Sequence, residues 1–183
     1  MSMTRLGDIF SIGLVGMAMA LLLGACAGTG PKVVGNYDPA TDFSQFRTFA
    51  FTQPLGSDKQ SGRTAVSIRL IAATVRELQS RGLQYVDNNP DLMVNIFVQE
   101  TSGVPNSPFF HTHGGAATWS GYDLRASAAM QISEGTIAVD VFDTRQNMLV
   151  FEGFAQDRVT EAMRDRLDET INDAIASIFE TFP

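Results

Sequence analysis

The chain has 183 residues, of which 44% are hydrophobic and 18% charged, and its formal net charge is −7 at pH 7. These proportions are those of an ordinary globular protein and exclude a disordered chain. The acidic balance, without a basic stripe that carries interleaved aromatic residues, excludes a nucleic-acid partner, because phosphate backbones attract clustered Lys and Arg. Attachment to a membrane would have to come from an anchor rather than from surface charge.

Residues 1–25 have the features of an export signal. Arg5 precedes an apolar run over residues 12–23, which is too short for the roughly 20 residues that span a bilayer as a helix. The run leads into Leu23-Gly24-Ala25-Cys26, which resembles the lipobox of bacterial lipoproteins: a branched apolar residue, two small residues and a cysteine. The pattern predicts cleavage after Ala25 and lipidation of Cys26. The alternatives are an ordinary signal peptide or an uncleaved anchor.

Cys26 is the only cysteine, so an intramolecular disulfide is excluded. Ala27 follows it in place of the Asp that retains lipoproteins in the inner membrane of Gram-negative bacteria. We therefore expect acyl chains such as palmitate on Cys26 to hold the protein at the periplasmic face of the outer membrane. Residues 26–36 would be the lipidated cysteine and a short flexible tether, which as coil spans roughly 17 Å. Residues 37–183 would form a single domain.

The first half of this domain shows one strand and one helix. Aromatic and β-favouring residues predict a strand over residues 46–52, followed by a loop over 53–62. Helical spacing of apolar residues predicts a helix over 64–81, which Gly82 would end as the residue after its C-cap. The predicted buried stripe consists of Ile68, Ile71, Ala72, Val75 and Leu78.

Strands dominate the second half. An extended segment over 83–86 precedes a strand over 91–100, where Leu92, Val94, Ile96 and Val98 share one face. Two further strands are predicted over 122–133 and 136–143, joined by a tight turn at Glu134-Gly135. Another follows over 148–155, and its short polar connection, 144–147, favours antiparallel pairing.

A helix is predicted over 160–181, because Met163, Leu167, Ile171, Ala174, Ile175, Ile178 and Phe182 form one apolar stripe. The whole pattern predicts an α+β fold: a mostly antiparallel (mixed) sheet with two helices packed on one face, as a two-layer sandwich.

Residues 37–51 (YDPATDFSQFRTFAF) resemble the opening of the bacterial lipoprotein family known as domain of unknown function 4136. Further matching pieces follow in the family's order, namely Ile68-Arg69, Arg81-Gly82, Pro90-Asp91-Leu92, Gly135-Thr136-Ile137, Val139-Asp140-Val141, Leu149-Val150-Phe151 and Gly153. Members often have tryptophan where this chain has Phe51 and Phe151. The resemblance implies a periplasm-facing lipoprotein of α+β fold, and it brings no agreed enzymatic activity and no catalytic residues.

The long loop over residues 101–121 is the candidate site for a ligand or partner. It contains the side chains of Phe109, Phe110, His111, His113 and Trp119, and long loops in compact domains are often functional. Two histidines, with Asp123 as a third donor, would make an incomplete zinc site. We therefore expect no metal and no cofactor, and interpret the loop as a segment that packs on the sheet edge or contacts a partner.

Catalytic motifs are not evident elsewhere. Asp140 and Asp143 are three residues apart on a strand and so face opposite sides of the sheet, which favours solvated or hairpin-end roles over paired acids. The leading hypothesis is a non-catalytic binding or accessory domain with an unidentified envelope protein as partner. The alternatives are a hydrolase or metal-dependent enzyme that uses the loop from His111 to Trp119, and a structural envelope component.

Overall fold

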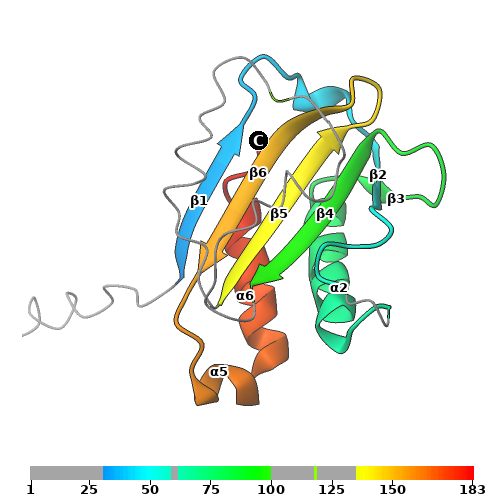
Figure 1. Cartoon of the computed structure of the whole chain (residues 1–183). Coiled ribbons are helices and arrows are strands. Elements are labelled where there is room, and N and C mark those ends of the chain that lie inside the picture. The colour runs from blue at the N-terminus through cyan, green and yellow to red at the C-terminus, as the bar shows by residue number, and fades with distance from the viewer. Residues whose placement is uncertain (1–30, 59–61, 100–117, 119–134) are drawn as a thin grey trace, which may run out of the picture. The chain divides into compact units, whose positions relative to one another are not determined.

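The structure is a computed structural model that describes residues 31–58, 62–99, 118 and 135–183 (Figure 1). All of the described residues belong to one compact unit, Pro31–Pro183. Among the described residues, no helix has both the length and the hydropathy needed to cross a bilayer.

The described residues form a mixed, open sheet of six strands in the order β1-β6-β5-β4-β2-β3. The pairs β1/β6, β6/β5 and β5/β4 are antiparallel, whereas β2 is parallel to both β4 and β3. The strands are β1 (Lys32–Tyr37), β2 (Thr48–Phe51), β3 (Gln84–Tyr85), β4 (Leu92–Gln99), β5 (Thr136–Asp143) and β6 (Met148–Gln156). The predicted α+β class is confirmed, and the predicted strand over 122–133 lies outside the described residues.

Strand β1 begins inside the segment that the sequence assigns to the flexible tether. Residues 32–36 pair with the end of β6, with Lys32 opposite Gln156 and Asn36 opposite Glu152. Their order therefore comes from a strand more than a hundred residues away, which local composition does not reveal. The segment left between Cys26 and the sheet is residues 27–31.

Helix α2 (Ala65–Ser80) is one residue shorter at each end than predicted, and its buried face is rotated. Thr64 caps its start by accepting a hydrogen bond from the backbone N–H of Ser67 at 3.0 Å. Gly82 follows its end with a φ of +86°, a conformation that favours glycine. Ile68 is 57% exposed, contrary to the prediction, and the helix buries Ser67, Leu70, Ala73, Thr74 and Leu78.

The predicted C-terminal helix is two helices, α5 (Glu161–Asp165) and α6 (Leu167–Phe179). Arg166 separates them, with a φ of −116° and a ψ of 42° that end the first helix. The hydroxyl of Thr170 in α6 donates to the carbonyl of Met163 at 3.2 Å and ties the two helices together across the break. A 3₁₀ turn, η2 (Phe43–Gln45), precedes β2.

One apolar core joins α2 and α6 to one face of the sheet, and Figure 1 shows both helices on the same side of the strands. The predicted face of β4 lies in this core, as do Val139 of β5 and Phe151 of β6. The helices contribute Leu70, Ala73, Leu78, Ile171, Ala174, Ile175, Ile178 and Phe179. The opposite face of the sheet carries a second, smaller apolar cluster of Ala138 and Phe154, flanked by Val34 and Phe97.

Candidate functional site

The residues selected as site candidates from the sequence lie outside the described part of the chain. They are Leu23-Gly24-Ala25-Cys26 at the cleavage and lipidation site, Phe109, Phe110, His111, His113 and Trp119 in the long loop, and Asp123. Their roles remain predictions. Within the described ranges, no group of three or more His, Cys, Asp or Glu side chains is arranged to hold a metal ion.

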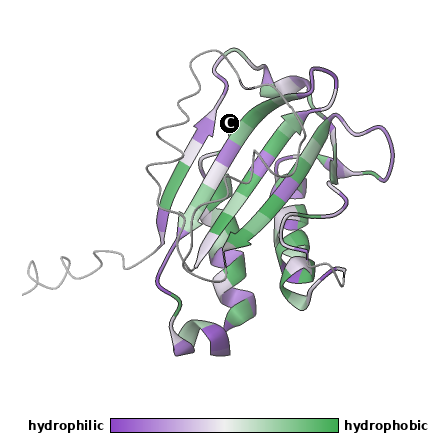
Figure 2. Ribbon diagram, in the orientation of Figure 1, coloured by the Kyte–Doolittle hydropathy of each residue, from purple (hydrophilic) through white to green (hydrophobic). Residues whose placement is uncertain are grey.

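A polar row crosses the sheet on the face opposite the helices. Asp140 of β5 stands opposite Glu152 of β6 on one side and opposite Asn95 of β4 on the other. Asn36 of β1 extends the row beyond Glu152. The exposed fraction is 1% for Asp140 and 0% for Glu152 and Asn95. Figure 2 shows hydrophilic residues interrupting otherwise apolar strands in the middle of the sheet.

A β-bulge places the two carboxyl groups side by side. Near the turn, Phe142 pairs with Leu149, but the next residue of β5, Val141, pairs with Phe151. Val150 is therefore an extra residue in β6, and its carbonyl accepts the backbone N–H of Asp38 at 2.9 Å. Without the bulge Asp140 would face Phe151, because an antiparallel register sets which side chains share a face. The bulge brings Glu152 to the same face as Asp140.

The amide of Asn95 has a fixed orientation. Its Oδ1 accepts hydrogen bonds from the hydroxyl of Thr52 at 3.0 Å and from the backbone N–H of Gly56 at 2.7 Å. Both bonds direct the oxygen toward β2 and the loop that follows it, so Nδ2 is the atom of this amide that can donate. Among the described residues, neither carboxyl oxygen of Asp140 has a hydrogen-bond partner.

The pKa of Asp140 is raised well above its usual value of 3.8. Burial is the largest cause, since it disfavours the charged form, and the neighbouring carboxyl of Glu152 raises the pKa further. The nearby side chain of Asn95 opposes both effects by stabilising the carboxylate. Asp140 therefore favours its protonated form more than an exposed aspartate does.

The sequence interpretation of Asp140 as a solvated or hairpin-end residue is wrong, whereas that of Asp143 as a hairpin-end residue is confirmed. Asp143 is 2% exposed and accepts the backbone N–H groups of Arg145 at 2.7 Å and Gln146 at 3.2 Å. Its other oxygen accepts from Nε2 of Gln146 at 3.0 Å. The partner of Asp140 is Glu152, a pairing that sequence reasoning missed.

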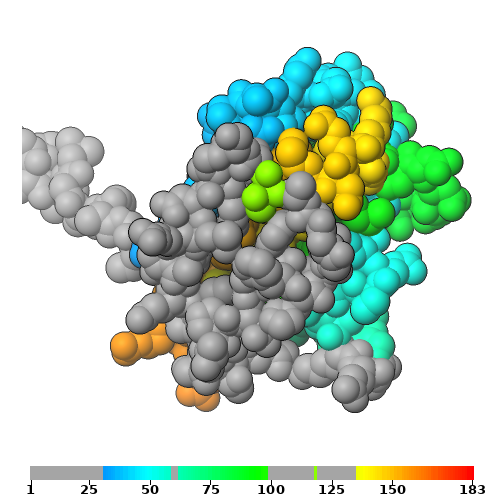
Figure 3. All heavy atoms as spheres, turned by 45° about the horizontal axis from the view of Figure 1, so that its top comes forward, coloured from blue at the N-terminus to red at the C-terminus, as the bar shows by residue number. Residues whose placement is uncertain are grey.

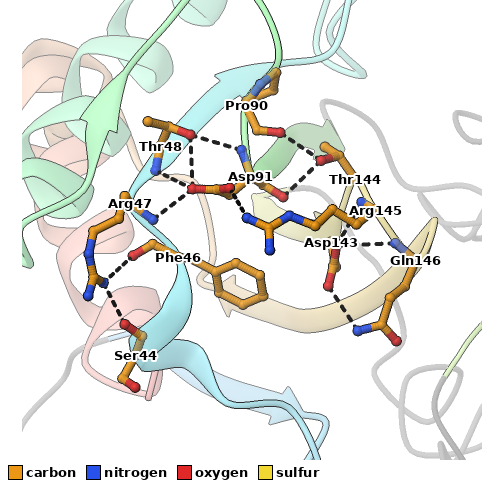
Figure 4. A network of polar contacts seen from close by, with 10 residues as sticks. All are labelled: Ser44, Phe46, Arg47, Thr48, Pro90, Asp91, Asp143, Thr144, Arg145 and Gln146. Carbon is orange, nitrogen blue, oxygen red and sulfur yellow. Dashed lines mark hydrogen bonds and ion pairs between the residues drawn. The ribbon is translucent and has the colours of Figure 1, made fainter.

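Asp91 organises a second polar network, drawn in Figure 4, at the end of the sheet where β4 begins. Its Oδ2 accepts the backbone N–H of Arg47 at 2.9 Å, the backbone N–H of Thr48 at 3.1 Å and the hydroxyl of Thr48 at 3.0 Å. Its Oδ1 pairs with the guanidinium of Arg145. Its backbone carbonyl accepts the N–H of Thr144 at 3.0 Å. One residue thus fastens β2 and the β5–β6 turn to the start of β4.

These contacts hold the pKa of Asp91 at about 2, below its usual value of 3.8. The backbone N–H of Arg47 contributes most, and Arg145 and Thr48 add to it against the opposing effect of burial. Because every described partner belongs to the fold itself, the network is structural rather than a site for a ligand. It accounts for the Pro90-Asp91-Leu92 motif.

Asp91→Ala is expected to lower the free energy of unfolding by about 2–3 kcal/mol at pH 7, because it leaves several backbone donors unsatisfied. The lowered pKa of Asp91 also makes the free energy of unfolding depend on pH. The native protein gains this stability above about pH 4 and loses about 1–2 kcal/mol of it as the pH falls toward 2. Urea unfolding across this pH range measures both effects.

Arg145→Ala is the matched control, because it removes only an ion pair whose arginine is 61% exposed. Its expected cost is below about 1 kcal/mol. Equal losses in the two variants would contradict the assignment of Asp91 as the centre of the network.

The comparisons with known proteins concern the family and the fold. The model of the family described as a domain of unknown function, DUF4136, matches residues 33–183. The crystal structure of a DUF4136 family protein from Bacteroides thetaiotaomicron is similar, with a TM-score of 0.63, 13% identity and coverage of 85% of this chain and 95% of that chain. No curated protein matches the chain.

Two other solved structures match the chain with lower TM-scores. A PDZ domain protein from Parabacteroides distasonis has a TM-score of 0.52 at 16% identity, and the match covers 91% of this chain but 40% of that one. A PelC dodecamer from Paraburkholderia phytofirmans has a TM-score of 0.46 at 9% identity, with 82% and 95% covered. The family match extends over the whole described domain apart from its first two residues, and the chain therefore belongs to the DUF4136 family.

Proposed function

We propose that this protein is an exported lipoprotein, attached through acyl chains on Cys26 to the periplasmic face of the outer membrane. The observation that carries the proposal is the tetrapeptide Leu23-Gly24-Ala25-Cys26 directly after an apolar run of signal length. The position of the folded unit supports it, because the unit begins at Pro31, just beyond the cysteine. Signal removal would therefore leave the sheet and its core complete.

We further propose that the domain, a two-layer sandwich of sheet and helices, acts as a non-catalytic binding or accessory module for another envelope protein. The surroundings of four of its carboxyl groups support this role. Asp91 and Asp143 bind the backbone of their own fold, and Asp140 and Glu152 are buried on the sheet. A lipid anchor would raise the local concentration of such a module near its partners.

Cys26→Ser is expected to abolish lipid attachment and to release the protein from the membrane fraction, because serine does not form the thioether. Metabolic labelling with an alkyne fatty acid and fractionation of the cells measure the two effects. Circular dichroism is expected to stay native, since the residue precedes the folded unit. A serine variant that still fractionates with membranes as the native protein does would overturn the proposed anchor.

Cross-linking in intact cells tests the accessory role. A binding module is expected to yield the same envelope protein repeatedly, and the yield should fall when the anchor is removed by Cys26→Ser. The role would be overturned if no partner were recovered while the purified protein turned over a cell-wall substrate. Loss of that turnover in His111→Ala would then assign catalysis to the loop over residues 101–121.

A further inference from the structure

Several elements start or stop together at one end of the domain. The register places the first residue of β1, Lys32, opposite the last residue of β6, Gln156, which in turn lies opposite the first residue of β5, Thr136. Residues 157–166, which include α5, follow directly, and α6 starts after them. We call Lys32 together with residues 157–166 the α5 end, which lies at the bottom of Figure 1.

The opposite end of the domain contains the Asp91 network. The segment after β1, the β5–β6 turn and the segment before β4 gather there, and Figure 3 shows them side by side on the surface. Their contacts include the bond from the backbone N–H of Asp38 to Val150 and the bond from Thr144 to Asp91. We call this surface the Asp91 end. Strand β6, with nine residues, runs between the two ends and is about 30 Å long.

Chain length limits which end can approach the bilayer. Six peptide units connect Cys26 to Lys32, and even fully extended they reach at most about 21 Å. If the Asp91 end lay on the lipid surface, Lys32 would stand about 30 Å above it. That distance exceeds the reach of the chain, so a lipidated Cys26 is incompatible with the inverted orientation.

The charges do not oppose an orientation with the α5 end toward the bilayer. Residues 157–166 balance three arginines, Arg158, Arg164 and Arg166, against three acids, Asp157, Glu161 and Asp165, and Lys32 adds one positive charge to the α5 end. The Asp91 end exposes Arg47 and Arg145 as well as Asp42 and Asp87. Neither end presents charge of one sign to an anionic lipid surface, so the orientation rests on the reach of the chain.

We propose that the α5 end faces the lipid bilayer and that the Asp91 end points away from it, toward the periplasm. The inference rests on the proposed lipidation of Cys26. In this orientation the lipid surface is the partner of residues 157–166, and the Asp91 end and the long sides of the sheet are left for protein partners.

Site-specific fluorescence quenching tests this orientation in the full lipidated protein. Lipidation consumes the only native thiol, Cys26, so an engineered cysteine can be labelled alone. Ala162→Cys places a fluorophore on an exposed position of α5, and Asn88→Cys places one on an exposed position near the start of β4. The proteins are reconstituted in vesicles of phosphatidylethanolamine and phosphatidylglycerol that contain a headgroup-nitroxide lipid. We expect at least about threefold stronger quenching at position 162, because collisional quenching needs contact with the headgroups.

Equal quenching at the two positions, or stronger quenching at position 88, would overturn the proposal. An insert of about twenty Gly/Ser residues after Ala27 removes the limit on reach. With this insert, most of the difference in quenching between positions 162 and 88 is expected to disappear. An unchanged contrast would overturn the argument from chain length. Flotation of the same vesicles measures anchoring separately: protein that does not float refutes the proposed lipoprotein, whereas floating protein with the wrong quenching pattern refutes only the orientation.

Discussion

Ile175→Asp is expected to unfold the domain. Ile175 has an exposed fraction of 0% and lies in the main core between α6 and the sheet. An aspartate there would be a buried charge without a partner, or would have to be protonated to avoid that, and either outcome costs several kcal/mol. Small domains have about 5–15 kcal/mol of stability in total. Far-UV circular dichroism during thermal or urea unfolding measures the loss.

Two substitutions on the same helix separate the effect of burying a charge from the effects of adding a charge and of replacing Ile175. Asn172→Asp introduces the same charge at an exposed position that already contacts Arg76, so a change within about 0.5 kcal/mol is expected. Ile175→Val keeps the position apolar and is expected to cost about 0.5–1.5 kcal/mol. If Ile175→Asp melted with the native protein, the assignment of α6 to the core would be wrong.

Elements whose pattern is local could be predicted from the sequence. Strand β4 alternates Leu92, Val94, Ile96 and Val98 toward one face, and the structure places all four against the core. Gly82 marks the end of α2 because its positive φ is a local property of the backbone. The β5–β6 pairing follows from a short polar turn between two apolar strands.

Elements that depend on distant partners could not be predicted. Strand β1 is ordered by β6, and its small residues read as a tether when taken alone. Ile68 belongs to the apolar spacing of α2, yet the helix buries Leu70 and Ala73 in the core instead. Ile68 is left exposed, a case in which tertiary packing overrides local pattern.

The pairing of Asp140 with Glu152 is a further feature that the sequence alone could not predict. Counting back from the β5–β6 turn, with Asp143 opposite Met148, places Asp140 opposite Phe151. The extra residue Val150 shifts the register by one and puts Glu152 there instead. A bulge of this kind has no reliable signature in a single sequence. The pairing of Asp140 with Glu152 could therefore be found only in the structure, whereas the predicted lipidation motif at Cys26 can be found in the sequence alone.

Asp140→Asn is expected to stabilise the domain by about 1–3 kcal/mol at pH 7, because it removes a buried carboxyl group that is costly to ionise beside Glu152. The new amide remains polar and keeps the size of the aspartate side chain. The sign of the pH dependence follows from the raised pKa. The native state holds the proton more tightly than the unfolded chain, so its stability is greatest at low pH and declines as the pH rises through the folded pKa of Asp140.

Asp143→Asn is the matched control on the same strand, equally buried but bonded to its own turn. It is expected to lose about 1 kcal/mol, since one oxygen acceptor becomes a donor. Guanidinium unfolding from pH 4 to 8 should therefore separate the variants by sign, with Asp140→Asn gaining stability over the native protein as the pH rises. A loss of stability in Asp140→Asn like that of Asp143→Asn would show that Asp140 is held as a satisfied carboxylate, and its assignment as a carboxyl group that retains its proton would have to be abandoned.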